Sequence, residues 1–266
     1  MVKKFNEFIE ESYDETISAE DTPECLLKIV EFINSINLNL NNIADGRVGS
    51  IHDEDDVIDC LKESEEFIVF EKDMDSYDND KIYIIKPKIR EWFDIEVIYN
   101  NNHYYVNIKS SNLTTFDNIG SVSSLMFGLF GIKKSMKNLS KADMYSELFK
   151  EYNKHEENGY DDIKNSDYYF LVINKRQTSK CFMTSLNHIN KNSIRPNGSN
   201  LPFQCKWIRN SKKISLDRHH ICDIIIETVF NSLIKTIEIF EKEPIKKYMN
   251  KHNKLNIPDI TNPKLW

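Results

Sequence analysis

An acidic residue, a carboxamide and a lysine are spaced in this chain in a way that suits a divalent cation and a phosphate. Asp94 stands thirteen residues before Asn107, and Lys109 follows two residues later. A carboxylate can hold Mg²⁺ against a phosphodiester, where the cation lowers the pKa of a bound water and neutralises developing charge. A neighbouring lysine can orient that water or stabilise the transition state. The pattern therefore predicts metal-dependent hydrolysis of a phosphodiester, with a plain solvated hairpin as the alternative.

Two β-rich runs carry these residues. In the first, from Phe93 to Tyr99, apolar and acidic side chains alternate, and three consecutive asparagines then give a turn signal. In the second, the period of two sends Asn107 and Lys109 to one face and Ile108 to the other. We therefore expect a hairpin that brings the three polar side chains together if Asp94 faces the same way.

The same segment resembles the PD-(D/E)xK nuclease superfamily, and more narrowly its type II restriction endonucleases. The resemblance covers roughly residues 88 to 118 and lies in Asp94, the step that follows it, and the run VNIKSS; a second stretch, IRPNGSNLPFQCKW at 194–207, resembles one near the carboxyl end of several such enzymes. It implies that Asp94 binds Mg²⁺, that the backbone carbonyl of Ile108 is a further ligand, and that Lys109 is the lysine of the motif. It also implies an α/β (α+β) fold with a mixed central sheet flanked by helices.

Two positions depart from the family pattern. Phe93 stands where a proline is usual, and Asn107 replaces the usual Asp or Glu. An amide oxygen can coordinate Mg²⁺ but carries no charge, so the pattern leaves open whether one or two Mg²⁺ ions bind. The candidates for a substituting acid are Glu96 on the first strand and Glu24 and Glu31 on an early helix.

The charge of the chain is strongly divided. Its net charge is −7, yet residues 1–80 hold 23 of the 42 acidic and only 6 of the 35 basic residues. Between positions 174 and 218, ten lysines and arginines accompany a single acid, Asp217. Such a segment can contact phosphates and base edges, whereas a solvated loop in an Asn- and Lys-rich chain is the alternative. The expected DNA contacts are Arg176, Lys180, Lys191, Asn192, Arg195, Asn197, Asn200, Gln204, Lys206 and Arg209.

Periodicity and capping signals indicate one nuclease domain over residues 1–266. Its expected parts are an acidic helical region (1–80), a catalytic core (81–173), and a basic recognition segment with a long carboxyl-terminal helix (174–266). Helices are expected after Thr22, over 52–66 as an exposed helix, after Ser121 and Ser140, and over 216–243, with a central strand over 168–173.

Other classes of protein fit the sequence poorly. No apolar run approaches the roughly 18 residues of a membrane span, and the acidic amino-terminal residues do not resemble a signal peptide. The five cysteines form no CxxC pair, which disfavours a disulfide framework or a zinc knuckle. His219 and His220 lack metal-ligand spacing, so we assign them to helix capping or phosphate contact. A cytoplasmic protein without a membrane partner is expected.

These features together predict a sequence-specific type II restriction endonuclease that hydrolyses double-stranded DNA with Mg²⁺. A homodimer is expected because two-fold protein symmetry matches a palindromic site, and a cognate DNA methyltransferase is the expected partner in the same system. Two alternatives remain: a structure-specific repair or recombination nuclease of the same fold, and a non-catalytic DNA-binding protein with a decayed site.

Overall fold

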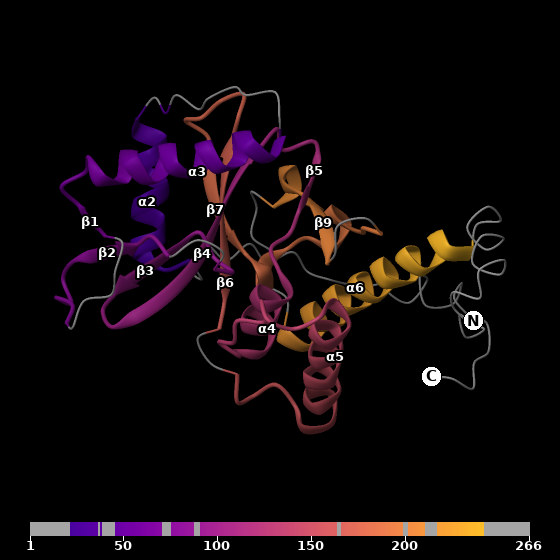
Figure 1. The fold of residues 1–266 in the computed structure, drawn as a ribbon. Helices are drawn as coiled ribbons and strands as arrows, with labels where there is room; N and C mark the ends of the chain where they lie inside the picture. The colour runs from indigo at the N-terminus through magenta and orange to yellow at the C-terminus, as the bar shows by residue number, and fades with distance from the viewer. Residues whose placement is uncertain are drawn as a thin grey trace.

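The computed structural model describes residues 22–36, 38, 46–70, 76–87, 91–163, 166–198, 202–210 and 217–241, which are arranged around a six-stranded mixed sheet (Figure 1). The helices are α2 (Glu24–Ser35), α3 (Gly46–Lys62), α4 (Val122–Phe130), α5 (Lys141–Asn158) and α6 (Arg218–Glu241). The strands are β1 (Phe67–Phe70), β2 (Ile82–Ile85), β3 (Ile95–Tyr99), β4 (Asn102–Ser111), β5 (Phe116–Asn118), β6 (Tyr168–Asn174), β7 (Cys181–Ser185), β8 (Ile194–Pro196) and β9 (Phe203–Lys206). The predicted mixed sheet flanked by helices, with a carboxyl-terminal helix, is confirmed.

The large sheet has the order β1-β2-β3-β4-β6-β7. Strand β3 is antiparallel to both of its neighbours, β2 and β4, β6 pairs with β4 in parallel, and β7 lies at the edge of the sheet, antiparallel to β6. A parallel pair needs a crossover connection, which α4 and α5 provide. The β3–β4 hairpin turns at Asn100 and Asn101, whose φ angles of 50° and 59° suit asparagine.

The two faces of the large sheet are covered by different helices (Figure 1). On one face, α2 and α3 pack on a core that contains Val106 and Ile108 of β4. On the other face, α4, α5 and α6 enclose a second core with Tyr168 and Phe170 of β6. Because side chains alternate along β4, its odd-numbered residues face the second core.

The helix expected over 52–66 spans Gly46–Lys62, and the prediction that it is exposed is wrong. Val57, Ile58 and Leu61 are buried because this apolar stripe packs against β1 and β4. The predicted helix starts at Ser121 and Ser140 are confirmed, since both hydroxyls accept a backbone N–H of the first turn. No helix in the described ranges is long and apolar enough to cross a membrane.

A second, three-stranded antiparallel sheet has the order β5-β9-β8. It begins a few residues after β4, and its strands β8 and β9 pack against α6. The Thr236 hydroxyl of α6 donates to the carbonyl of Gly198 (3.0 Å), just after β8. The small sheet is therefore anchored to the carboxyl-terminal helix and joined by a short connection to the strand that carries Asn107 and Lys109.

Candidate active site

Asp94 lies immediately before β3 and is held there by β4. Its backbone N–H donates to the carbonyl of Val106 (3.0 Å), and its Oδ2 accepts a hydrogen bond from the backbone N–H of Ile108 (2.7 Å). The last backbone pair of the hairpin is Ile95 with Val106. The Asp94 side chain thus takes the place of a backbone partner for Ile108 just before β3 begins.

The backbone carbonyl of Ile108 points toward the same place. Within a strand, the N–H and C=O of one residue point to the same neighbouring strand. Because the N–H of Ile108 points to Asp94, its C=O points to the edge of β4 beside that carboxylate. A carboxylate oxygen and a carbonyl oxygen therefore come together, as the resemblance implies.

Burial dominates the electrostatics of Asp94. It raises the pKa of this carboxyl above its usual value, whereas the charge of Lys109 and the hydrogen bond from Ile108 lower it. The effect of Lys109 shows that its ammonium lies within electrostatic range of Asp94. A buried carboxylate with incomplete charge compensation is stabilised by an added cation, which is the electrostatic behaviour expected of a metal ligand.

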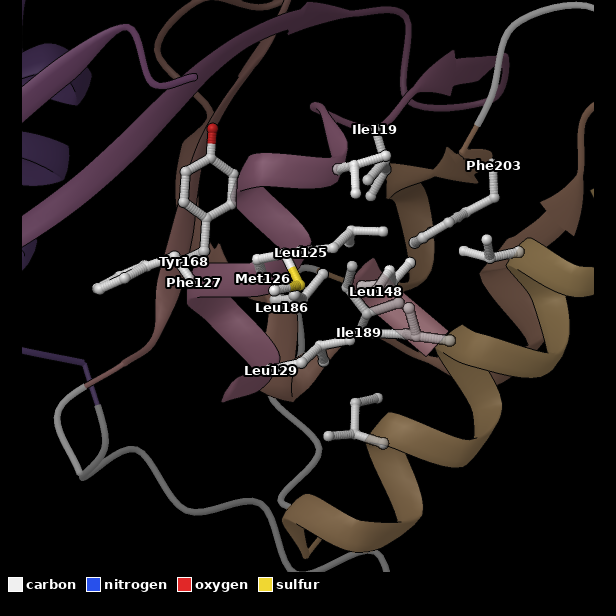
Figure 2. Packing of buried hydrophobic residues seen from close by; sticks show 14 of the residues in the cluster. Ile119, Leu125, Met126, Phe127, Leu129, Leu148, Tyr168, Leu186, Ile189 and Phe203 are labelled. Carbon is white, nitrogen blue, oxygen red and sulfur yellow. The ribbon is translucent and has the colours of Figure 1, made fainter. Parts of the chain in front are cut away.

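Asn107 lies beside Tyr168. Tyr168 stands at the edge of the apolar cluster with its hydroxyl directed away from it (Figure 2), and this hydroxyl donates to the carbonyl of Trp92 (2.7 Å). Burial raises the pKa of Tyr168, whereas the nearby polar side chains of Asn107 and Ser124 lower it. The Asn107 amide therefore lies close to the Tyr168 hydroxyl.

The amide oxygen of Asn107 is unsatisfied. Asn107 is 7% exposed, and its Oδ1 has no hydrogen-bond partner among the described residues. A buried oxygen without a donor is costly unless a water or a cation approaches it. Because Mg²⁺ prefers carboxylate, amide and carbonyl oxygens, the donor set of Asp94, Asn107 and Ile108 fits this ion.

Glu54 of α3 is a residue that the sequence analysis missed. Burial raises the pKa of Tyr168 well above its usual value, and the charges of Asp94 and Glu54 raise it further. Asp94 has the larger of these two charge effects, and that of Glu54 is the smaller. Glu54 precedes Val57 and Ile58 by three and four residues, so it continues their buried stripe toward the site. The sequence signal that could have indicated Glu54 is its helical spacing from the apolar residues Val57 and Ile58.

Lys109 also lies near a second carboxylate, Asp117 of β5. Burial raises the pKa of Asp117, whereas a hydrogen bond from Ser111 (2.5 Å) and the charges of Lys109 and Lys175 lower it. Lys175 in turn lies 3.0 Å from Asp53, whose side chain is fully buried in α3. These contacts tie β4, β5, β6 and α3 together around the lysine.

The other acids expected near the metal are elsewhere. Glu24 and Glu31 are exposed on α2, and Glu24 pairs with Lys28. Glu96 contacts His103 (2.8 Å) and Lys133 (3.8 Å) toward the turn of the hairpin. The structure therefore gives Glu24 and Glu96 charged partners other than Asp94 and leaves Glu31 exposed on α2.

The predicted DNA contacts fall into several groups. Arg176 and Lys180 are exposed in the β6–β7 turn, which follows the strand paired with β4. Lys191, Asn192 and Arg209 lie in short 3₁₀ turns, and Arg195, Gln204 and Lys206 lie in the small sheet. Asn200 lies outside the described residues.

Asn197 does not have the exposure expected of a DNA contact. It is 7% exposed, because its backbone N–H bonds the Ser232 hydroxyl of α6 (2.9 Å) and its amide nitrogen donates to Asn118 (3.0 Å). The loop is thus held against α6, and Asn197 supports a neighbouring side chain.

A second polar group lies between α5 and α6. His219 Nε2 is 2.9 Å from Glu156 and 3.8 Å from Asp223. The negative charges of Glu156 and Asp223 would repel a phosphate, so His219 does not suit the phosphate contact that the sequence suggested. The helix cap is Asp217, which accepts the backbone N–H groups of His219 and His220. An exposed ion-pair group explains these contacts.

Neither models of known protein families nor curated protein sequences match this chain. The case for a function therefore depends on the geometry of the site.

Proposed function

We propose that this protein is a Mg²⁺-dependent nuclease that hydrolyses double-stranded DNA, with the site-specific cleavage of a type II restriction endonuclease. The observation that carries the proposal is the buried, unpartnered Oδ1 of Asn107 on the same sheet face as Asp94 and Lys109. That arrangement suits a hard cation held beside a basic side chain.

Four oxygen donors would hold the ion: the carboxylates of Asp94 and Glu54, the amide oxygen of Asn107 and the backbone carbonyl of Ile108. A bound Mg²⁺ at this place supplies the acidity of a coordinated water and neutralises charge on the scissile phosphate. Two carboxylates would balance the charge of one ion, so Glu54 replaces the charge that Asn107 lacks.

The protein's own groups would then divide the remaining work. Lys109 would donate to the attacking water or to a phosphate oxygen in the transition state. Asp117, held by Ser111, would keep the Lys109 ammonium on the correct side. Tyr168 would fix the amide of Asn107 with its oxygen toward the metal.

The rest of the fold is compatible with this role. A mixed sheet with antiparallel β2-β3-β4 and a parallel β6 after a helical crossover agrees with a restriction-endonuclease-like fold. The exposed basic residues Arg176 and Lys180 follow β6 at the end of the sheet where Lys109 lies, and could contact the DNA backbone. A homodimer would match a palindromic site, and a cognate methyltransferase would protect the host DNA.

The test is digestion of a long duplex of known sequence by the purified chain with Mg²⁺, beside an EDTA control. Asp94→Ala and Lys109→Ala should each lower the cleavage rate by at least about 100-fold while mobility-shift binding persists. Asp59→Asn, at the far end of α3 where Asp59 pairs with Lys62, is the matched charge-removing control and should cut normally.

The outcomes separate the candidate functions. Discrete, metal-dependent fragments would support the restriction endonuclease, whereas preferential cutting of branched or nicked substrates would support a structure-specific nuclease. An uncut duplex that is still bound would support the non-catalytic alternative. Full activity in either active-site variant would refute the assigned roles.

A further inference from the structure

Three polar side chains form one row across the small sheet. Asn118 in β5 lies opposite Gln204 in β9, and Gln204 lies opposite Arg195 in β8. We call these three residues the polar row. Neighbouring strands are about 4.8 Å apart, so the row is roughly 10 Å wide.

A chain of hydrogen bonds fixes how each head group faces. The Nε and Nη2 of Arg195 donate to Gln204 Oε1 (3.0 and 2.8 Å), and Gln204 Nε2 donates to Asn118 Oδ1 (3.3 Å). The buried Asn197 donates to the same Asn118 oxygen (3.0 Å). Because a guanidinium can only donate, Gln204 must turn its oxygen to Arg195 and its nitrogen to Asn118.

The consequence is a surface that offers donors only. Each of the two amide oxygens in the polar row already receives two hydrogen bonds, which use its lone pairs. The groups that remain are N–H groups of Asn118, Gln204 and Arg195. The row is therefore complementary to a ligand edge that carries acceptors only.

The surroundings make this surface positive and rigid. The Arg195 guanidinium carbon lies 3.9 Å from the centre of the Phe116 ring, and Lys206 lies 5.8 Å from the same ring. The acid of β5, Asp117, is directed to the opposite side, where Ser111 donates to it. Side chains already held in place lose less entropy on binding, so the row is organised before any partner arrives.

We propose that the polar row determines specificity by recognising guanine in the major groove of DNA. Guanine presents two acceptors there, O6 and N7, whereas thymine presents one acceptor beside a methyl group, and adenine and cytosine each present an amino donor that would face an N–H group of the row. A row about 10 Å wide fits the major groove, about 12 Å wide, and is too wide for the minor groove, about 6 Å wide. This inference rests on the proposed function to the extent that duplex DNA is the substrate.

The test reverses one group of the row without changing its shape. Asn118→Asp keeps the oxygen that Gln204 and Asn197 contact but places an acceptor where the free amide nitrogen stood. Full-length protein carrying Lys109→Ala, with and without Asn118→Asp, would be used to select binders from a pool of randomised duplexes, followed by sequencing. We expect the parent to enrich guanine at a fixed position, and Asn118→Asp to lower that enrichment at least about tenfold.

A matched control removes the effect of charge alone. Asn192→Asp makes the same change at an exposed asparagine outside the small sheet, and it should weaken binding without changing the preferred base. Arg195→Lys keeps the charge but loses the fork that holds Gln204, so it should also lose the preference for guanine. If circular dichroism shows that Asn118→Asp is unfolded, Arg195→Lys becomes the variant that tests whether the polar row selects guanine.

The results distinguish this inference from the proposed function. Selection of a guanine-containing motif by a chain that never cuts DNA would refute the nuclease and support the polar row. Discrete cleavage at a site that neither Asn118→Asp nor Arg195→Lys alters would refute the polar row and leave the nuclease standing. Selected sequences without guanine, or no DNA binding, would also overturn the inference.

Discussion

Replacement of Tyr168 by phenylalanine tests the geometry of the active site without touching a metal ligand. The aromatic ring stays in its apolar pocket, and only the hydroxyl is removed. That hydroxyl donates to the carbonyl of Trp92 at 2.7 Å and lies beside the side chain of Asn107. Tyr168 is fully buried, so water cannot easily replace the lost group.

The magnitude follows from the number of groups left without a partner. The carbonyl of Trp92 loses its hydrogen-bond donor. One buried polar group left unpaired costs about 1–3 kcal/mol, so the variant should lose about 1–3 kcal/mol of unfolding free energy. The loss of the hydroxyl beside Asn107 should also lower the rate of DNA cleavage by more than about tenfold.

Urea unfolding followed by tryptophan fluorescence measures the first effect, and a cleavage assay with Mg²⁺ measures the second. Tyr145→Phe is the matched control, because Tyr145 is also buried but makes no hydrogen bond that the described residues reveal. We expect Tyr145→Phe to change stability by less than about 0.5 kcal/mol. A loss below about 0.5 kcal/mol in Tyr168→Phe, or cleavage equal to that of the control, would refute the role assigned to Tyr168.

Three further changes probe the charges around the site. Glu54→Gln should weaken Mg²⁺ binding in isothermal calorimetry by roughly tenfold or more, since one of two carboxylates is removed, whereas Asp59→Asn should not. Asp94→Asn should stabilise the metal-free protein more at pH 7.5 than at pH 4 in urea unfolding. The pKa of Asp94 is raised in the folded state, so the protonated carboxyl favours folding at acidic pH. This contribution to the free energy of unfolding falls as the pH rises from the unfolded pKa to the folded pKa. An equal effect of Asp94→Asn at both pH values would contradict the assignment. Lys175→Met should destabilise the folded protein by about 3–5 kcal/mol because it leaves the buried Asp53 unpaired. A variant with an unchanged melting temperature would show that the ion pair of Lys175 with Asp53 does not contribute to stability.

Local patterns predicted the part of the site that depends on one strand and its neighbour in sequence. The period of two placed Asn107 and Lys109 on one face, and three asparagines marked the turn that returns β4 toward Asp94. These inferences need no knowledge of distant contacts, because strand alternation and turn conformation are local properties.

The remaining parts depend on packing between distant segments. Glu54 becomes a candidate ligand only because α3 docks on β4, and its acidic neighbours made the segment look solvated. Tyr168 stands in an apolar run that predicts a central strand but not the partner of its hydroxyl. The polar row depends on the register of β5 against β9, which follows β5 by roughly 80 residues in the chain, and a single sequence does not encode that register in any local signal.

The carboxamide at position 107 is therefore weak support for a decayed site. A second aspartate there would place two buried carboxylates on adjacent strands, where repulsion raises the cost of the metal-free state. In the proposed site, Asp94 supplies one negative charge from the sheet and Glu54 supplies the other from a separate helix. A site that had lost its chemistry would have no need for a buried Asn107 oxygen without a hydrogen-bond donor, because such an oxygen costs stability when no cation is present. Nor would it need a lysine, Lys109, within range of Asp94. The unfavourable free energy of these buried polar groups is explained if a cation binds between Asp94 and Asn107 and a phosphate group then binds to that cation.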